Sequence, residues 1–251
     1  MTVKSITVVI FSVLVISILL FGLKPFRQAL DAEVAIVGEP GVYKTEVKRL
    51  PDASFLVAVR TAMPNVKAEM VRWWFADYLQ TTEHYRLWHP KDHVWMSWEN
   101  KVPGEIVGAS HLVHEYIGSE LSKLRIQFVS PSEFFGYDPN DENTFAICAR
   151  VGLLEEKINI AKMCHVVRDN EEGAEMRSRF WLGHVSERQG NETVRSLSGF
   201  VGNRAVTRLI VLGEQNAKDL QKHAKEEMRY LADLLPGIYK KEARQLETTK
   251  H

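Results

Sequence analysis

The feature that most constrains the fold of this chain is a series of apolar segments of strand length followed by one long amphipathic helix. Turn residues separate the segments, and such runs in succession indicate an antiparallel meander. They are predicted at residues 105–118, 124–129, 144–152, 158–168 and 175–185. The helix is predicted at residues 213–235. Pro236 is its expected stop, because proline lacks the backbone N–H that a helix interior needs.

One strand and further helical sequence precede the meander. Residues 54–60 are predicted as a strand, and Pro64 is predicted to begin a helix through the letters NVKAEMVRWWFADYL. A sheet and a long helix bury their apolar surfaces together when the sheet curves around the helix. We therefore expect an α+β fold in which a curved antiparallel β-sheet encloses a cavity against the C-terminal helix.

The two cysteines of the chain are expected to lie opposite each other in this sheet. If the turn at residues 154–158 is tight, facing residues have numbers that sum to 312, which pairs Cys148 with Cys164. Two cysteines are too few for a disulfide scaffold and lack the spacing of a structural zinc site. They are therefore predicted to be cross-strand neighbours that form a disulfide in an oxidising compartment.

The N-terminal segment carries a separate signal. From Ile6 to Leu23 the chain is apolar almost throughout, and a helix of this length nearly spans the hydrocarbon core of a bilayer. We expect residues 1–30 to form a single-pass membrane anchor, and the alternative is a cleaved signal that leaves the protein secreted. Residues 31–240 are then one domain and residues 241–251 a polar tail.

The charge balance argues against nucleic acid as a partner. Lysine and arginine total 32, aspartate and glutamate also total 32, and the formal net charge is zero. Basic runs with interleaved aromatic residues are absent from the sequence. We therefore expect no nucleic-acid binding, and the sequence leaves open whether the domain forms a homodimer.

Titratable residues interrupt two apolar faces, where an unpaired charge is costly to bury. On the terminal helix, His223 and Glu227 fall one turn apart on the stripe marked by Leu220, Leu231 and Leu234, so they are close enough to share an ion. The alternative is a surface pair at the edge of the stripe. Glu115 shares a strand face with apolar residues and needs a cation or a hydrogen-bond donor.

Other histidines fall on faces that we expect to look inward. His165 lies on the apolar side of its strand, where a core histidine bonded to a backbone carbonyl is the alternative. His184 shares a face with Phe180, although it could also simply end that strand. Further upstream, three histidines lie among tyrosine and tryptophan side chains in an aromatic stretch that is either a pocket rim or a packing patch: His84, His89 and His93.

Several stretches in a fixed order resemble the 2,4-diacetylphloroglucinol hydrolase family. They are HYRLWHPKDHVWMSW, GEIVGASHLVHEYIG, AKMCHVVRD, GAEMRSRFWLG and HAKEE, and the resemblance covers residues 70–230. It implies a START-like helix-grip fold with one zinc ion in its cavity. It also implies hydrolysis, by metal-activated water, of the carbon–carbon bond between an acyl group and a polyhydroxylated aromatic ring. The substrate is then a small aromatic ketone of the acylphloroglucinol type.

The resemblance also implies the metal ligands, which are His93, Glu115, His223 and Glu227. Two imidazoles and two carboxylates suit zinc. His89 competes with His93 for the first position. His93 is favoured because it follows Tyr85 by eight residues, a spacing associated with the family's substrate-binding tyrosine.

Roles in the reaction follow from the same resemblance. His165 is expected to shuttle a ring proton with a pKa near the working pH, Tyr85 to bind a ring hydroxyl, and Glu227 to act as a base as well as a ligand. Phe180 stands where some relatives carry a phenolic hydroxyl, so the exact substrate is left open. The residues predicted to contact the substrate are Tyr85, His89, Phe180 and His184.

Two other functions fit the sequence pattern. One is a non-enzymatic helix-grip carrier of an apolar aromatic or lipid ligand at a membrane, in which His223 and Glu227 are a structural pair. A carrier binds its ligand without changing it. The other is an anchored hydrolase of a different carbonyl substrate, such as an ester or another β-diketone.

Overall fold

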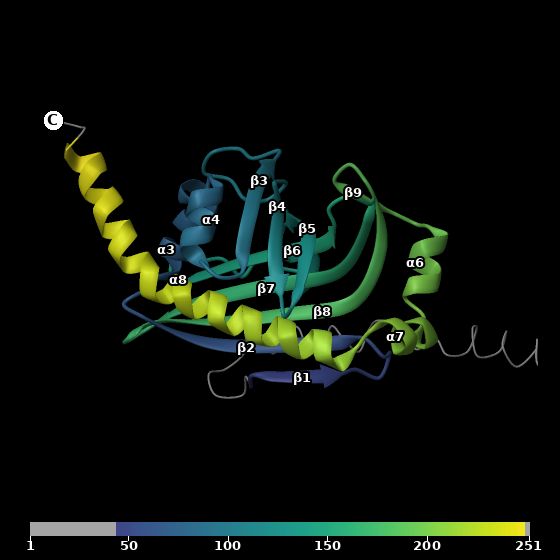
Figure 1. Ribbon diagram of the computed structural model, residues 1–251. Coiled ribbons are helices and arrows are strands. Elements are labelled where there is room, and N and C mark those ends of the chain that lie inside the picture. The colour runs from purple at the N-terminus through teal and green to yellow at the C-terminus, as the bar shows by residue number, and fades with distance from the viewer. Residues whose placement is uncertain (1–43, 249–251) are drawn as a thin grey trace, which may run out of the picture.

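A computed structural model describes residues 44–248, with side chains through residue 242. Its strands form one curved antiparallel sheet, and the long helix α8 (Glu214–Thr248) runs across the sheet, as Figure 1 shows. The strand order is β1-β2-β8-β7-β6-β5-β4-β3, with β9 beside β8. The predicted α+β architecture of a curved sheet with a long C-terminal helix is therefore confirmed.

The sheet is a continuous meander from β3 to β8, and the two N-terminal strands extend it beyond β8. Its strands are β1 (Glu46–Arg49), β2 (Phe55–Pro64), β3 (His93–Glu99), β4 (Ser110–Ile117), β5 (Glu120–Val129), β6 (Thr144–Leu153), β7 (Ile158–Asn170), β8 (Gly173–Gln189) and β9 (Glu192–Val194). The shorter helices are α3 (Ala68–Trp73), the π-helix η1 (Trp74–Tyr78), α4 (Thr82–Trp88), α5 (Ser132–Phe135), α6 (Leu197–Gly202) and α7 (Ala205–Val211).

The β6–β7 hairpin has the register expected from its turn. Cys148 faces Cys164 across the two strands, and a disulfide joins them. Both residues belong to a small apolar cluster that also contains Phe134 of α5 and Trp181 of β8. This cluster lies on the face of the sheet that α8 does not cover, because side chains alternate between the two faces of a strand.

The main core lies between the sheet and the helices. Alternate residues of β6, such as Phe145 and Ile147, pack in one cluster with Trp74, Trp88 and the buried stripe of α8. Burial of apolar surface on this scale is the main favourable contribution to folding. This core fixes α8 against the sheet and so fixes the positions of the polar residues that α8 carries.

Two predicted helix boundaries are wrong. Pro64 ends β2, Asn65 has a positive φ of 61°, and the helix begins only at Ala68, whose backbone N–H donates to the Asp169 carboxylate at 2.7 Å. Pro236 lies inside α8 and does not end it. A proline costs a helix one hydrogen bond, and packing against the sheet offsets that loss.

The aromatic stretch after residue 80 is more regular than expected. It forms α4 and then β3, and Thr81 caps α4 by accepting a hydrogen bond from the His84 N–H at 3.3 Å. The threonine cap was a signal in the sequence for this helix start.

The predicted membrane localisation is corrected. Among residues 44–248, no helix is long and apolar enough to cross a membrane. The segment from Ile6 to Leu23, on which that prediction rests, lies outside the described residues.

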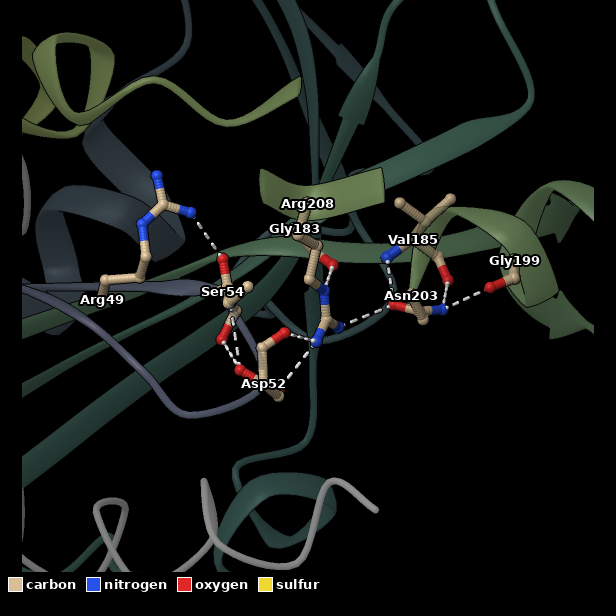
Figure 2. A network of polar contacts seen from close by, with 9 residues as sticks. Arg49, Asp52, Ser54, Gly183, Val185, Gly199, Asn203 and Arg208 are labelled. Atoms are coloured by element: carbon tan, nitrogen blue, oxygen red, sulfur yellow. Dashed lines mark hydrogen bonds and ion pairs between the residues drawn. The ribbon is translucent and has the colours of Figure 1, made fainter. Parts of the chain in front are cut away.

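Helices α6 and α7 are tied to β8 by polar contacts, which Figure 2 shows. The Asn203 amide bonds both the N–H and the carbonyl of Val185, at 3.0 and 2.7 Å. Arg208 donates to the Gly183 carbonyl at 2.8 Å and to the Asp52 carboxylate at 2.7 Å. These contacts hold the end of β8 where the strand leaves its regular register.

Candidate active site

Helix α8 supplies two of the predicted site residues. His223 and Glu227 lie one turn apart beside the buried residues Ala224, Met228 and Leu231. Only 4% and 9% of their surfaces are exposed. They therefore lie in the interior and are not a surface pair at the edge of the apolar stripe.

The sheet and α4 supply the rest of the site. β3 begins at His93, which pairs in register with Glu115 of β4. Tyr85 of α4 stacks on the His93 ring, with the ring centroids 3.6 Å apart. The Tyr85 hydroxyl donates a hydrogen bond to the Glu115 carboxylate. Three consecutive elements, α4, β3 and β4, therefore bring their side chains to the same point as the distant helix α8.

Four buried side chains converge at this point. The Nε2 of His93 lies 3.4 Å from a Glu227 carboxylate oxygen and 3.9 Å from a Glu115 carboxylate oxygen. The Nε2 of His223 lies 4.0 Å from the same Glu115 oxygen. Ligand atoms of His93, Glu115 and His223 all lie within 4.8 Å of one another, a spacing at which one ion can bind all three.

A hydrogen bond to the backbone determines which ring nitrogen of His93 carries the hydrogen. Its Nδ1 lies 2.8 Å from the Tyr85 carbonyl, which can only accept, so Nδ1 carries the hydrogen. The Nε2 atom then presents a lone pair, and it has no hydrogen-bond partner among the described residues. Burial lowers the pKa of His93 to about 4, so the imidazole is neutral at physiological pH. A neutral imidazole with a free lone pair is the form that binds a metal.

His89 has the opposite arrangement. The Asp92 backbone N–H donates to its Nδ1 at 3.1 Å, so the neutral ring carries its hydrogen on Nε2. That Nε2 lies 3.4 Å from the Asp92 carboxylate. His89 therefore has no lone pair directed at Glu115 or Glu227.

The site has more carboxyl groups than its own cationic side chains can balance if all of them are ionised. Burial, with Glu115 and Asp92 adding to it and His223 opposing it, raises the pKa of Glu227 to about 8. Burial by itself lowers the pKa of His223, but Glu115, Glu227 and Asp92 together raise it. Buried carboxylates this close together are costly without a compensating cation. The donor set and its charge therefore fit a divalent metal ion.

A cavity of about 460 Å³ opens beside these residues. Six of the predicted site residues line it: Tyr85, Glu115, His165, Phe180, His223 and Glu227. Most of the remaining wall is apolar and includes Phe75, Trp88, Ile126, Phe128 and Met163. An apolar pocket of this size with a few polar groups suits a small aromatic ligand.

His165 lies on the cavity wall, but its pKa differs from the prediction. A pKa near the working pH was predicted, but burial lowers the pKa of His165 to about 4. Its Nδ1 lies 2.7 Å from the Ser178 hydroxyl, and its ring meets Phe180 edge-on at 5.6 Å. The imidazole is therefore neutral at physiological pH and held in a fixed orientation.

Two predicted substrate contacts do not line the cavity, namely His89 and His184. His89 lies behind His223, with which its ring stacks at 5.3 Å. In β8, the register shifts between the Ala161–Leu182 and Asn159–Ser186 pairs, and Gly183 has a φ of 90°. This irregularity changes which side chains of β8 face the cavity after Gly183. His184 interacts electrostatically with Arg208, Lys162 and Asp52.

Two residues of the site region were not predicted. His111 lines the cavity, stacks on Trp98 at 4.7 Å and meets the Tyr85 ring at 5.2 Å. Asp92 lies 3.3 Å from the Nδ1 of His223. Its position directly before His93 in the sequence was the available signal, but a solvated loop residue gives the same pattern.

Comparison with known proteins shows which family the chain belongs to. Residues 39–240 match the family model described as DAPG hydrolase PhiG domain. The chain belongs to this family. The predicted family is therefore confirmed, and so is the prediction that the chain is a hydrolase.

Curated relatives in the family have modest sequence identity. Phloretin hydrolase of Eubacterium ramulus is 26% identical over 204 residues, which cover 76% of this chain and 69% of the relative. The 2,4-diacetylphloroglucinol hydrolase of Pseudomonas protegens is 27% identical over 215 residues, which cover 76% of this chain and 66% of the relative. The chain thus spans about two thirds of the length of these relatives.

Among solved structures, Ara h 8.0201 has a TM-score of 0.44 and 9% identity, covering 72% of this chain and 97% of that chain.

Proposed function

We propose that this chain hydrolyses the carbon–carbon bond between an acyl group and a polyhydroxylated aromatic ring. The names of the two relatives, phloretin hydrolase and 2,4-diacetylphloroglucinol hydrolase, support an aromatic ketone as the substrate. The largely apolar cavity, with several polar groups in its wall, supports the same class of ligand.

A zinc ion held by His93, Glu115, His223 and Glu227 is part of this proposal. The observation that carries it is the buried Nε2 of His93, which lies between two carboxylates without a hydrogen-bond partner among the described residues. Imidazole nitrogen and carboxylate oxygen are both established zinc ligands, so this donor set suits zinc. Bound zinc supplies a Lewis acid that polarises a carbonyl and lowers the pKa of water.

The net reaction adds water across the bond that breaks. The hydroxyl of water stays on the acyl carbon, which leaves as a carboxylic acid, and a hydrogen replaces the acyl group on the ring. Neutral His165 accepts a proton from a ring hydroxyl and returns it to the ring carbon that bears the acyl group. Glu227 accepts the proton that water loses and passes it to the ring oxygen, which regains its hydrogen as the carbon–carbon bond breaks.

Tyr85 and Phe180 orient the ring. Burial raises the pKa of the Tyr85 hydroxyl well above its usual value, so this hydroxyl stays protonated and keeps its hydrogen bond to Glu115. Its oxygen is then free to accept a hydrogen bond from a ring hydroxyl of the substrate. Phe180 contributes an apolar wall that His165 meets edge-on. His89 and His184 have no part in substrate contact in this proposal, because neither lines the cavity.

The test combines metal content with activity on the full chain. We expect the purified wild type to hold about one zinc per chain by elemental analysis and to release acid from an acylphloroglucinol. We expect His223→Ala to lose the zinc and at least about 100-fold in activity, since it removes both a ligand and its charge. His114→Ala is the matched control, because the His114 ring packs at a tilt against Trp95, with the ring centroids 4.7 Å apart, and does not line the cavity. A wild-type protein that holds no zinc after gentle purification and reloading would refute the proposal.

A further inference from the structure

Asp92 lies behind the candidate metal site and contacts two histidines at once. One of its carboxylate oxygens is 3.3 Å from the Nδ1 of His223 and 3.4 Å from the Nε2 of His89. Asp92 is buried, with 8% of its surface exposed. A buried carboxylate needs hydrogen-bond donors, and the Nδ1 of His223 provides one, whereas the Nε2 of His89 lies at ion-pair distance without forming a hydrogen bond.

The arrangement of protons around Asp92 follows from the backbone. The Asp92 N–H donates to the Nδ1 of His89, so the hydrogen of the neutral His89 ring is on Nε2, the atom nearest the carboxylate. His223 donates from Nδ1 to the same carboxylate, which leaves its Nε2 on the side of Glu115. The His89 and His223 rings stack with an interplanar angle of 16°, which fixes the plane of His223 as well.

We infer that Asp92 is a positioning residue that holds His223 with its Nδ1 protonated and its Nε2 directed at the metal, with His89 supporting Asp92 from behind. This inference rests on the proposed zinc site. A carboxylate that accepts a hydrogen bond from a ligand imidazole fixes the ring and makes it a better donor to the metal.

An alternative use of the same residues is a second metal site made of His89, Asp92 and His223, whose ligand atoms also lie within 4.8 Å of one another. The hydrogen bonds argue against it. The Nε2 of His89 carries a hydrogen and the Nδ1 of His223 donates one, so neither atom offers a lone pair to an ion.

The first experiment measures zinc affinity by competition with a chelator in the full chain. Asp92→Asn keeps a hydrogen-bond acceptor but removes the charge, and Asp92→Ala removes both. We expect the zinc dissociation constant to rise about 10–100-fold, with the larger effect for Asp92→Ala. We expect the wild type to bind one zinc.

Asp169→Asn is the matched control. The Asp169 side chain is 17% exposed, against 12% for Asp92, and it accepts a hydrogen bond from the first residue of α3, away from the site. We expect Asp169→Asn to lower the thermal unfolding midpoint and to leave zinc affinity unchanged. An equal loss of zinc affinity in Asp92→Asn and Asp169→Asn would reduce Asp92 to a purely structural role and overturn the inference.

The second experiment uses nitrogen-15 NMR of the histidines in the zinc-loaded wild type to determine which ring nitrogen of His223 is protonated and which binds the metal. We expect the His223 Nδ1 to carry a proton and the Nε2 to show the shift of a metal-bound nitrogen. Zinc bound at Nδ1, or two zinc ions per chain with one lost in Asp92→Asn, would overturn the inference. A wild type that binds no zinc would refute the proposed function itself, which is a different outcome from zinc binding that Asp92 does not affect.

Discussion

Two histidines four residues apart in the α4–β3 region differ in which ring nitrogen carries the hydrogen. The Tyr85 carbonyl accepts a hydrogen bond from the Nδ1–H of His93, whereas the Asp92 N–H donates a hydrogen bond to the Nδ1 of His89. One backbone contact therefore frees the His93 Nε2 to bind a metal, and the other keeps the His89 Nε2 protonated. Sequence spacing favoured His93 over His89, and these contacts give a physical reason for that preference.

We expect His93→Gln to weaken zinc binding by more than about 100-fold, because it removes a ligand. His89→Gln should weaken zinc binding by about tenfold or less, because that residue only supports Asp92. Chelator competition at neutral pH measures both constants. A larger loss in His89→Gln than in His93→Gln would mean that the two roles are reversed.

The buried imidazole of His165 makes the free energy of unfolding depend on pH. Burial lowers its pKa from 6.5 to about 4, so between these values the unfolded chain binds more protons than the folded protein. The free energy of unfolding therefore falls as the pH drops below about 6.5. His165→Asn cannot take up this proton, and it keeps a polar atom near Ser178.

We expect the loss of unfolding free energy between pH 7 and pH 5 to be smaller in His165→Asn than in the wild type, by about 2 kcal/mol. Urea unfolding at the two pH values gives this difference. Other titrating groups are common to both proteins and cancel. Parallel pH profiles for the two proteins would show that His165 titrates normally in the folded state.

At the scale of elements, α7 serves as a brace for the irregular end of β8. Arg208 is buried and bonds the Gly183 carbonyl, the Asp52 carboxylate and the Asn203 amide oxygen, as Figure 2 shows. Gly183 also lines the cavity. The contacts of Arg208 therefore hold part of the cavity wall to the β1–β2 turn.

We expect Arg208→Ala to lower the free energy of unfolding by about 2–4 kcal/mol, because it leaves a buried carbonyl and a half-buried carboxylate without their donor. Lys218→Ala removes an exposed ion pair with Glu214 one turn away on α8 and should cost less than about 0.5 kcal/mol. Urea unfolding compares the two. Equal effects would show that Arg208 adds no more than a surface ion pair.

The strands were more predictable than the helix ends, for reasons visible at particular residues. A tight turn fixes a hairpin register, so the pairing of Cys148 with Cys164 followed from the sequence. Pro236 inside α8 and the changed alternation at His184 depend on tertiary packing and on a bulge, which local patterns do not contain. The inward positions of Glu115, His165 and His223 followed from periodicity, whereas the hydrogen-bond partners of His89 could not be read from its spacing.

At the scale of the whole molecule, the site exists only in the folded chain. The proposed ligands come from β3, β4 and α8, which are held together by the curved sheet and the core beneath α8. Zinc that binds only the folded state must then stabilise it through mass action. The metal site and the fold are therefore thermodynamically coupled.

We expect free zinc at about 100 times its dissociation constant to raise the free energy of unfolding by about 2.7 kcal/mol in the wild type. His223→Ala should show little change at the same zinc concentration. Thermal unfolding with and without zinc measures the shift. Equal stabilisation of both proteins would place the zinc at another site.

The most direct test of the central claim is the fate of solvent oxygen during turnover of an acylphloroglucinol. The zinc-loaded protein is incubated with the ketone in water labelled with oxygen-18, and the products are analysed by mass spectrometry. We predict one labelled oxygen in each molecule of released carboxylic acid and a ring product that carries hydrogen where the acyl group was. Recovery of the intact ketone, bound but unchanged, would contradict the account.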